Sequence, residues 1–415
     1  MHRGLQEVLD ARVIYLDMNS FFASVEQQHQ PYFRNRPLAV VSHNVPRGTV
    51  LAASYEAKHF GIKTGTRLEA ARLLCPSLQV CEPNGTRYKA AHHAFMKILT
   101  DLFGSEVQAR SIDEAVIYLA PNWYDSERAQ QMARTIKQRF KHQLGEHIRC
   151  SIGIAPNSFL GKVATDLQKP DGLVEIKLAE LTTILGSLEL IQLPGIAAGN
   201  ISRLAYHTIY SPLQLYYADP QLLYQQFGIW GQYWWWRLHG YEVDYQFSPP
   251  KSMSHQHVLK HWLKSYQEAW PIIMRMGDRL IHRLRHNHFQ CQKVSLYLSL
   301  SNAPSLCAER QFTVPTSQYT FLLETLALLL HSFPLPLLGP IRKISVGFFL
   351  LTEEGSGLQL DLFNQVAPKE SLSKAVESIR SRFGINAIQI GQAMTLEPKV
   401  AQEQIGFGRI KDRGP

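Results

Sequence analysis

Cysteine is scarce in this chain, and the few cysteines are not spaced as a zinc site or a disulfide framework requires. Five occur in 415 residues, none in a C-x-x-C pair, at Cys75, Cys81, Cys150, Cys291 and Cys307. An odd number without paired spacing argues against a disulfide-stapled secreted domain and against a structural zinc site. We therefore expect a reducing environment and cytoplasmic localisation.

Long apolar runs are also missing. The most apolar stretch, residues 322–340, is broken by polar residues and prolines well before the ~20 residues that a membrane span needs. Residues 1–12 contain acids and no apolar signal core. We therefore expect no membrane partner, and the length allows about two to four domains with a sizeable core.

Positive charge is in excess, with 43 Lys and Arg against 34 Asp and Glu and a formal net charge of +9. Such a balance favours an acidic partner, with nucleic acid ahead of an anionic membrane surface. A solvated basic surface with no partner explains the charge alone equally well.

Carboxylates lie at the ends of two apolar runs. Residues 13–16 have the pattern of a buried strand that ends at Asp17, and Asp113 and Glu114 directly precede a second β-type run. Two such strands could place three carboxylates on one sheet edge, which would suit divalent metals and phosphoryl transfer. Taken alone, Asp113-Glu114 is as well explained by a hairpin turn.

The order of the predicted elements up to residue 176 is β-α-β-β-α-β, the order of a ferredoxin-like sheet. Amphipathic helices over residues 88–103 and 127–144 each end at a glycine, and Asn19 or Ser20 can cap a helix that follows the first strand. An all-helical, tryptophan-rich segment comes next, then a proline-containing linker and a second α+β unit. The predicted fold class is therefore α+β with several domains.

Two further segments have alternative interpretations. The glycine turn in residues 192–204 could direct backbone N–H groups at a DNA phosphate, or it could join an ordinary helical hairpin. The tryptophans of residues 227–240 suit core packing better than base stacking.

The string QLDLF, residues 359–363, has apolar anchors after a Gly-Ser segment. It could dock in a partner's groove through Gln359, Leu360, Leu362 and Phe363, or make a local packing contact.

Four motifs together resemble the Y-family (translesion) DNA polymerases, in particular the bacterial DNA polymerase IV and the catalytic subunit of DNA polymerase V. They are VIYLDMNSFFASVEQ, LAASYEAKHFGIKTG, SIDEAVIYL and SIGIAPNSFLGKVATDLQKPDG, in the order and spacing of that family. The resemblance implies a ferredoxin-like palm (1–20 and 85–176) with small inserted fingers (21–84) and a helical thumb (177–248). A linker (249–254), a separate α+β little finger (255–351) and a tail (352–415) with a clamp-binding peptide at 359–363 would follow.

The resemblance also implies the site. Asp17, Asp113 and Glu114 match the metal-binding carboxylates, and the main-chain carbonyl of Met18 should reach one of two Mg²⁺ ions. Two ions would activate the primer hydroxyl and neutralise the triphosphate. Magnesium prefers hard oxygen ligands such as these.

Nucleotide-binding residues follow from the same motifs. Phe22 matches the steric gate that excludes a 2′-hydroxyl, and Phe21 should pack near the triphosphate. Tyr55, Lys58 and Lys162 match residues that hold the triphosphate, for which a positive charge is suited.

The chain departs from the family at four positions. Lys58 stands where relatives often have arginine, which removes a bidentate fork but keeps the charge. Ala52 replaces a hydroxyl residue that contacts phosphate in some relatives, and Ala197 replaces the usual glycine of the hairpin turn. Asn19 replaces an aspartate, and we expect little loss there because it is not one of the three metal acids.

The implied activity is low-fidelity, template-directed DNA synthesis past damaged bases. The implied partners are primer-template DNA, deoxynucleoside triphosphates and a bacterial sliding clamp, and the resemblance leaves open an accessory subunit, as in polymerase V. A non-catalytic adaptor of the same fold is the alternative, but it leaves the intact acids, Phe22 and Lys162 unexplained. A nucleotide cyclase or another palm-fold enzyme fails to explain the second α+β unit and QLDLF.

Overall fold

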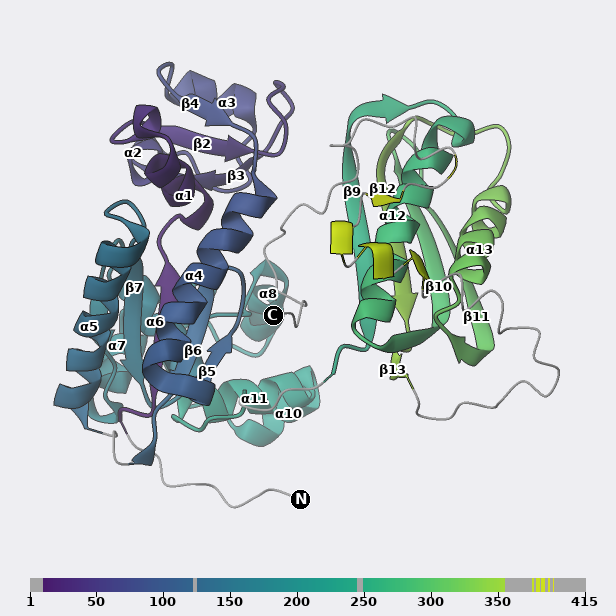
Figure 1. Ribbon diagram of the computed structural model, residues 1–415. Coiled ribbons are helices and arrows are strands. Elements are labelled where there is room, and N and C mark those ends of the chain that lie inside the picture. Colours follow the sequence, from purple (N-terminus) through teal and green to yellow (C-terminus); the bar gives the residue numbers. More distant parts are fainter. Residues whose placement is uncertain are drawn as a thin grey trace. The chain divides into compact units, whose positions relative to one another are not determined.

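The computed structural model describes residues 10–121, 125–244 and 249–354, together with 375–376, 378–380, 382–384, 387–388 and 391. Two compact units make up these residues, the first ending at residue 244 and the second beginning at 249 (Figure 1). The QLDLF peptide lies outside the described residues. Within the described ranges, no helix combines the length and the apolar character that crossing a bilayer requires.

A five-stranded sheet lies at the centre of the first unit, in the order β5-β6-β1-β7-β8. Strand β1 pairs antiparallel with β6 and β7, and β8 joins β7 in parallel. Helices α4 (Gly85–Phe103) and α5 (Ser126–Leu144) complete a β-α-β-β-α-β arrangement, so the ferredoxin-like prediction is confirmed, with β8 as an additional strand. The strands are β1 (Val13–Met18), β5 (Val107–Ala109), β6 (Glu114–Tyr118), β7 (Cys150–Ala155) and β8 (Leu173–Glu175).

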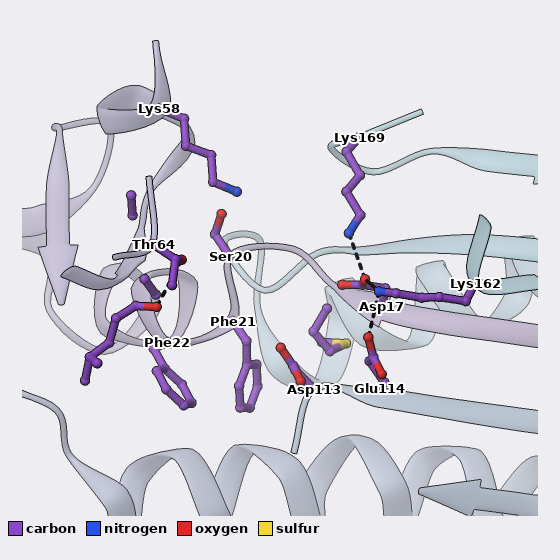
Figure 2. Close-up of a pocket in the computed structure, with 14 residues that line it drawn as sticks. Asp17, Ser20, Phe21, Phe22, Lys58, Thr64, Asp113, Glu114, Lys162 and Lys169 are labelled. Atoms are coloured by element: carbon purple, nitrogen blue, oxygen red, sulfur yellow. Dashed lines mark hydrogen bonds and ion pairs between the residues drawn. The ribbon is translucent and has the colours of Figure 1, made fainter. Parts of the chain in front are cut away.

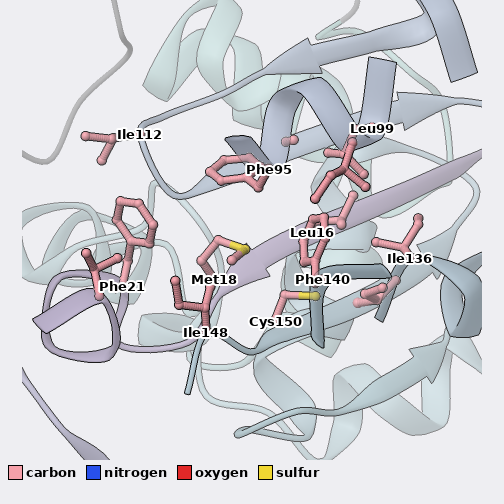
Figure 3. Packing of buried hydrophobic residues seen from close by; sticks show 14 of the residues in the cluster. Leu16, Met18, Phe21, Phe95, Leu99, Ile112, Ile136, Phe140, Ile148 and Cys150 are labelled. Atoms are coloured by element: carbon pink, nitrogen blue, oxygen red, sulfur yellow. The ribbon is translucent and has the colours of Figure 1, made fainter. Parts of the chain in front are cut away.

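The two faces of this sheet carry different helices, because side chains alternate along a strand. Leu16 and Met18 of β1 join a core cluster with residues of α4 and α5 (Figure 3). Val13 and Tyr15 join a second cluster with residues of helix α6 (Ser158–Leu167). Burial of each large apolar side chain stabilises the fold by about 1.5–3 kcal/mol. By the same alternation Asp17 belongs to the face that α6 covers.

Helix α6 approaches the sheet closely through two glycines. A Cβ atom on Gly153 of β7 would lie 2.1 Å from the carbonyl oxygen of Gly161, and one on Gly161 would lie 2.9 Å from Tyr15 Cβ. A residue with a side chain at either position would therefore push the helix away. The close approach brings Lys162, the residue after Gly161, over the ends of β1 and β6.

The segment 21–84, predicted as an insertion, contains a three-stranded sheet in the order β3-β2-β4. Its core includes Ile62 and Leu68, both fully buried. Neither Asn19 nor Ser20 caps α1 as predicted, because Ser20 has a φ of 46° and makes no side-chain cap hydrogen bond, and Asn19 bonds elsewhere. The elements are α1 (Phe21–His29), β2 (Leu38–Val41), β3 (Val50–Ala53), α2 (Tyr55–Lys58), α3 (Leu68–Leu74) and β4 (Gln79–Cys81).

Five α-helices follow the sheet, as the all-helical pattern predicts, and they share the core cluster of α6. Trp234 is buried there, its ring centroid 5.2 Å from that of Phe227, so its predicted packing role is confirmed. Trp230, in contrast, is 59% exposed. The helices are α7 (Leu181–Gly186), α8 (Ala198–Tyr206), α9 (Pro212–Tyr216), α10 (Pro220–Phe227) and α11 (Ile229–Leu238).

The second unit is the predicted α+β unit, with a four-stranded sheet in the order β11-β10-β12-β9 and two helices packed on it. Strand β9 begins at Ser252, inside the segment predicted as a linker. The elements are β9 (Ser252–Leu263), α12 (Tyr266–His286), β10 (Phe289–Leu300), β11 (Leu306–Thr316), α13 (Tyr319–His331), β12 (Ile341–Phe349) and β13 (Thr352–Glu353).

Candidate active site

A pocket opens where the ends of β1 and β6 face the inserted three-stranded sheet (Figure 2). Eight of the residues predicted for catalysis or nucleotide binding line it: Asp17, Met18, Phe21, Phe22, Lys58, Asp113, Glu114 and Lys162. The remaining lining residues are Ser20, Leu51, Ala52, Ala53, Thr64 and Lys169. The fold therefore gathers residues that are about 150 positions apart in the sequence at one place.

Strand register brings the first two acids together. Asp17 is the β1 partner of Glu114 on β6, and both side chains lie on the face covered by α6. Lys162 Nζ bonds to Asp17 and lies 2.6 Å from Glu114 Oε1. The hydroxyl of Tyr15 donates to Glu114 Oε2 at 3.0 Å.

Lys169 is a site residue that the sequence analysis did not single out. Its Nζ lies 2.7 Å from Asp17 Oδ2 and 2.7 Å from Asp166 Oδ1. The available signal was the sequence KPDG, since Pro170 and Gly172 end α6 and turn the chain back toward β8. Because the chain reverses here, Lys169 lies beside the end of β1, next to Asp17.

Two ammonium groups thus neutralise Asp17. Burial alone would raise the pKa of Asp17, but the charges of Lys162 and Lys169 outweigh it and hold that pKa below its ordinary value. Burial would likewise lower the pKa of Lys162, but Asp17 and Glu114 raise it above the ordinary lysine value. Asp17 and Lys162 are therefore both charged at neutral pH.

Asp113 lies in the turn before β6. Its carbonyl oxygen accepts the backbone N–H of Met18 at 2.9 Å, which places it beside the end of β1. Its carboxylate accepts the Ser111 hydroxyl at 2.5 Å. Burial, followed by the charges of Asp17 and Glu114, raises the pKa of Asp113 to about 6. A cation bound here would favour the ionised form of this acid.

The inserted segment supplies the opposite wall of the pocket. The Phe22 ring stacks on Tyr88 of α4 with centroids 4.3 Å apart, whereas Phe21 packs edge-to-face on Phe95 in the core (Figure 3). Lys58 extends toward the pocket from α2, and its Nζ lies 4.3 Å from the centroid of the Tyr55 ring. Tyr55 supports Lys58 in this way without lining the pocket itself.

The acids have the donor chemistry of a magnesium site, with three carboxylates and the main chain of Met18 at adjoining strand ends. Across the part of the chain that the structure describes, no three His, Cys, Asp or Glu groups are arranged to hold a metal ion. In this arrangement, Lys162 and Lys169 supply the positive charge at Asp17 and Glu114. The residues fit a divalent cation that competes with these ammonium groups.

Two family models match the chain. Residues 16–166 match the impB/mucB/samB family, and residues 250–362 match the impB/mucB/samB family C-terminal domain. All the pocket-lining residues except Lys169 fall within the first match.

Curated relatives match over nearly the full length. The chain is 30% identical to DNA polymerase IV of Pelotomaculum thermopropionicum over 409 residues, covering 97% of this chain and 98% of that protein. It is 28% identical to DNA polymerase IV 1 of Bacillus subtilis, covering 93% and 94% respectively.

Solved structures share the fold. A Y-family DNA polymerase chimera matches with a TM-score of 0.69 at 23% identity, covering 81% of this chain and 98% of the chimera. The DinB protein from Sulfolobus solfataricus matches with a TM-score of 0.54 at 23% identity over the same shares.

Proposed function

Since the chain belongs to the impB/mucB/samB family and is a Y-family translesion DNA polymerase, we propose that Asp17, Asp113 and Glu114 hold its catalytic metal ions. The observation that supports this most directly is the β1–β6 register, which sets Asp17 opposite Glu114 on one face. The hydrogen bond from Met18 to the Asp113 carbonyl brings the third acid to the same strand ends. Bound there, two Mg²⁺ ions would supply activation of the primer 3′-hydroxyl and charge neutralisation of the triphosphate.

Three lysines complete the site on this proposal. Lys58, Lys162 and Lys169 line the pocket from two sides (Figure 2), and an ammonium group is a suitable partner for a triphosphate oxygen. A triphosphate that binds here would draw Lys162 and Lys169 from their present ion pairs, which would leave Asp17 and Glu114 to hold the metal ions. The lysines thus hold the site together electrostatically until the nucleotide arrives.

Phe22 selects the sugar on the same proposal. Its side chain is 3% exposed and is fixed by the stack on Tyr88, so it cannot easily move away from a bulkier sugar. A rigid ring at the pocket wall excludes a 2′-hydroxyl by steric overlap. Deoxynucleoside triphosphates are therefore the proposed substrates, with primer-template DNA as the second.

Primer extension tests the metal assignment. The wild-type chain should extend a primer on an undamaged and on an abasic template in the presence of Mg²⁺. Asp113→Ala should lower the rate by at least roughly 100-fold, the scale on which a single electrostatic catalytic contact acts. Asp101→Ala, which changes an exposed acid of α4, is the matched control and should leave the rate unchanged.

The outcomes separate the candidate functions. Extension that survives in Asp113→Ala would remove the metal assignment. Wild-type protein that binds primer-template DNA without extending it would instead favour the non-catalytic adaptor. Extension by the purified chain alone would also show that no accessory subunit is obligatory.

We further propose that residues 359–363 dock on a bacterial sliding clamp. The support is the sequence itself, since Leu360, Leu362 and Phe363 are apolar anchors that follow a Gly-Ser segment. A ring around DNA would tether the polymerase and raise its effective concentration at the primer end.

A further inference from the structure

Asn19, two residues after the acid Asp17, connects three segments of the chain through hydrogen bonds. Its side-chain Oδ1 accepts the backbone N–H of Asp171 at 2.7 Å, and its Nδ2 donates to Ser151 Oγ at 3.0 Å. Its own backbone N–H donates to the Arg149 carbonyl at 2.8 Å. With 2% exposure, Asn19 is a buried hub between the end of β1, the start of β7 and the turn after α6.

Ser151 extends this hub to both ends of the turn. Its hydroxyl donates to the carbonyl of Gln168 at 3.3 Å and accepts the backbone N–H of Gly172 at 3.3 Å. Asn19 and Ser151 together therefore hold the turn of residues 168–172 at its first and last residues and at Asp171. Lys169, whose ammonium group contacts Asp17, lies inside the stretch that they hold.

The turn requires such support. Asp171 has a φ of 58°, a left-handed conformation that is unfavourable for a residue with a Cβ unless its surroundings fix it. The Asp171 N–H that Asn19 accepts would be left without this partner if the amide were removed. Lys137 also holds Asp171, since its Nζ donates to the Asp171 carbonyl oxygen at 2.6 Å and to Oδ1 at 2.7 Å. Loss of Asn19 would therefore loosen the turn that carries Lys169 at the Asp171 N–H, while Lys137 and Ser151 would still hold it elsewhere.

The amide also suits this position better than a carboxylate. Asn19 can accept from Asp171 and donate to Ser151 at the same time. The Ser151 hydroxyl proton is then available to Gln168, whose carbonyl oxygen lies at 3.3 Å, closer than Asn19 Oδ1 at 3.5 Å. A carboxylate would have no proton to give, so Ser151 would turn its own proton toward it and release Gln168. It would also add a negative charge close to Asp17.

We propose that Asn19 is a positioning residue that holds the turn of residues 168–172 so that Lys169 meets the triphosphate of the incoming nucleotide. This inference rests on the proposed function, in which Lys169 binds that triphosphate. The expectation that asparagine in place of the family's aspartate brings little loss concerned metal binding, whereas here Asn19 acts through Lys169 and not as a metal ligand.

Steady-state primer extension with Asn19→Ala, Lys169→Ala and the double variant tests the proposal. Asn19→Ala should raise KM for the nucleotide roughly tenfold with kcat changed less than about threefold, because binding and not chemistry loses a contact. In the Lys169→Ala background, adding Asn19→Ala should change KM less than about twofold. Asn287→Ala, which removes one asparagine hydrogen bond in the second unit, is the matched control and should leave KM unchanged.

A binding measurement and a conservative variant complete the design. With a dideoxy-terminated primer, the Kd for the nucleotide should rise in parallel with KM in Asn19→Ala. Asn19→Asp preserves the side-chain shape and should also weaken nucleotide binding, which keeps the proposal testable if Asn19→Ala folds poorly.

The results distinguish this inference from the proposed function. A wild-type chain that fails to extend primers would overturn the proposed function. Wild-type extension with an unchanged KM in both Asn19 variants would overturn only the inference. Fully additive effects of Asn19→Ala and Lys169→Ala on KM would also overturn the inference, because Asn19 would then act independently of Lys169.

Discussion

The ring of Phe22 stacks on the ring of Tyr88, with centroids 4.3 Å apart and planes inclined by 9°. Phe22 belongs to α1 of the inserted segment, and Tyr88 belongs to α4, which covers the five-stranded sheet. An ion pair between the buried Glu26 and the half-buried Arg87 joins the same two helices. The position of Phe22 in the pocket therefore depends on a helix that contributes no lining residue of its own.

Sugar selection should respond to both rings. We expect Phe22→Ala to lower the preference for deoxynucleotides over ribonucleotides by at least about tenfold, and Tyr88→Ala to lower it less, because Phe22 then loses its support but remains in place. The ratio of kcat/KM for dCTP and CTP measures the effect. Tyr88→Phe keeps the stacked ring and serves as the control. An unchanged ratio in Phe22→Ala would count against the gate.

Local sequence patterns were sufficient for the sheet and for the three acids of the pocket. Alternation along residues 13–18 determines the face on which Asp17 lies, and the glycines ending α4 and α5 mark helix ends that the structure contains. Resemblance to a family then identified Phe22, Lys58 and Lys162 as pocket residues.

Contacts between distant segments could not be predicted in this way. Tyr88 has the spacing of an ordinary apolar residue of an amphipathic helix, and nothing local indicates its stack on Phe22, 66 positions earlier. Asn19 is a residue type that often caps helices, but its side chain instead accepts the backbone N–H of Asp171, 152 positions later. Hydrogen bonds to Ser151 and Asp171 therefore replace the helix cap that the local sequence favours at Asn19.

The close approach of α6 to the sheet should make Gly153 intolerant of any side chain. We expect Gly153→Ala to reduce the free energy of unfolding by more than about 2 kcal/mol, because its Cβ would lie 2.1 Å from the Gly161 carbonyl oxygen. Thermal unfolding measures the change. Gly199→Ala in α8 meets no atom within 4 Å and should be neutral or stabilising by up to ~1 kcal/mol. Equal melting temperatures for Gly153→Ala and wild type would contradict the packing argument.

His92 should make the first unit sensitive to acid. Its Nδ1 lies 2.9 Å from the Ile112 carbonyl, and burial lowers the pKa of His92 to about 4, below its unfolded value. The unfolded chain therefore binds more protons between about pH 6.5 and 4, so stability falls as the pH falls through this window. Relative to His92→Gln, the wild-type chain should lose on the order of 3 kcal/mol across it.

Chemical denaturation at about pH 7 and about pH 4.5 measures this difference. His142→Gln, which changes an exposed histidine of α5, is the control and should retain the wild-type pH dependence. A His92→Gln variant that loses stability with the same slope as wild type would show that another group controls the response.

Clamp-stimulated synthesis should depend on QLDLF, although basal synthesis should not. We expect the double variant Leu362→Ala/Phe363→Ala to extend primers at the wild-type rate without a clamp and to lose most of the stimulation that a loaded clamp provides. The reason is that tethering acts through effective concentration, which can raise apparent affinity by roughly 10²- to 10⁴-fold without changing the active site.

A matched control separates docking from general loss of apolar surface. Leu335 and Leu338 are 81% and 60% exposed, and replacing both with alanine removes a comparable apolar area from the second unit. That variant should retain full stimulation, because its leucines lie outside the linear motif. Equal stimulation of the Leu362→Ala/Phe363→Ala variant and the wild type would remove the clamp assignment, and loss of basal synthesis in that variant would show that the peptide serves the polymerase core instead.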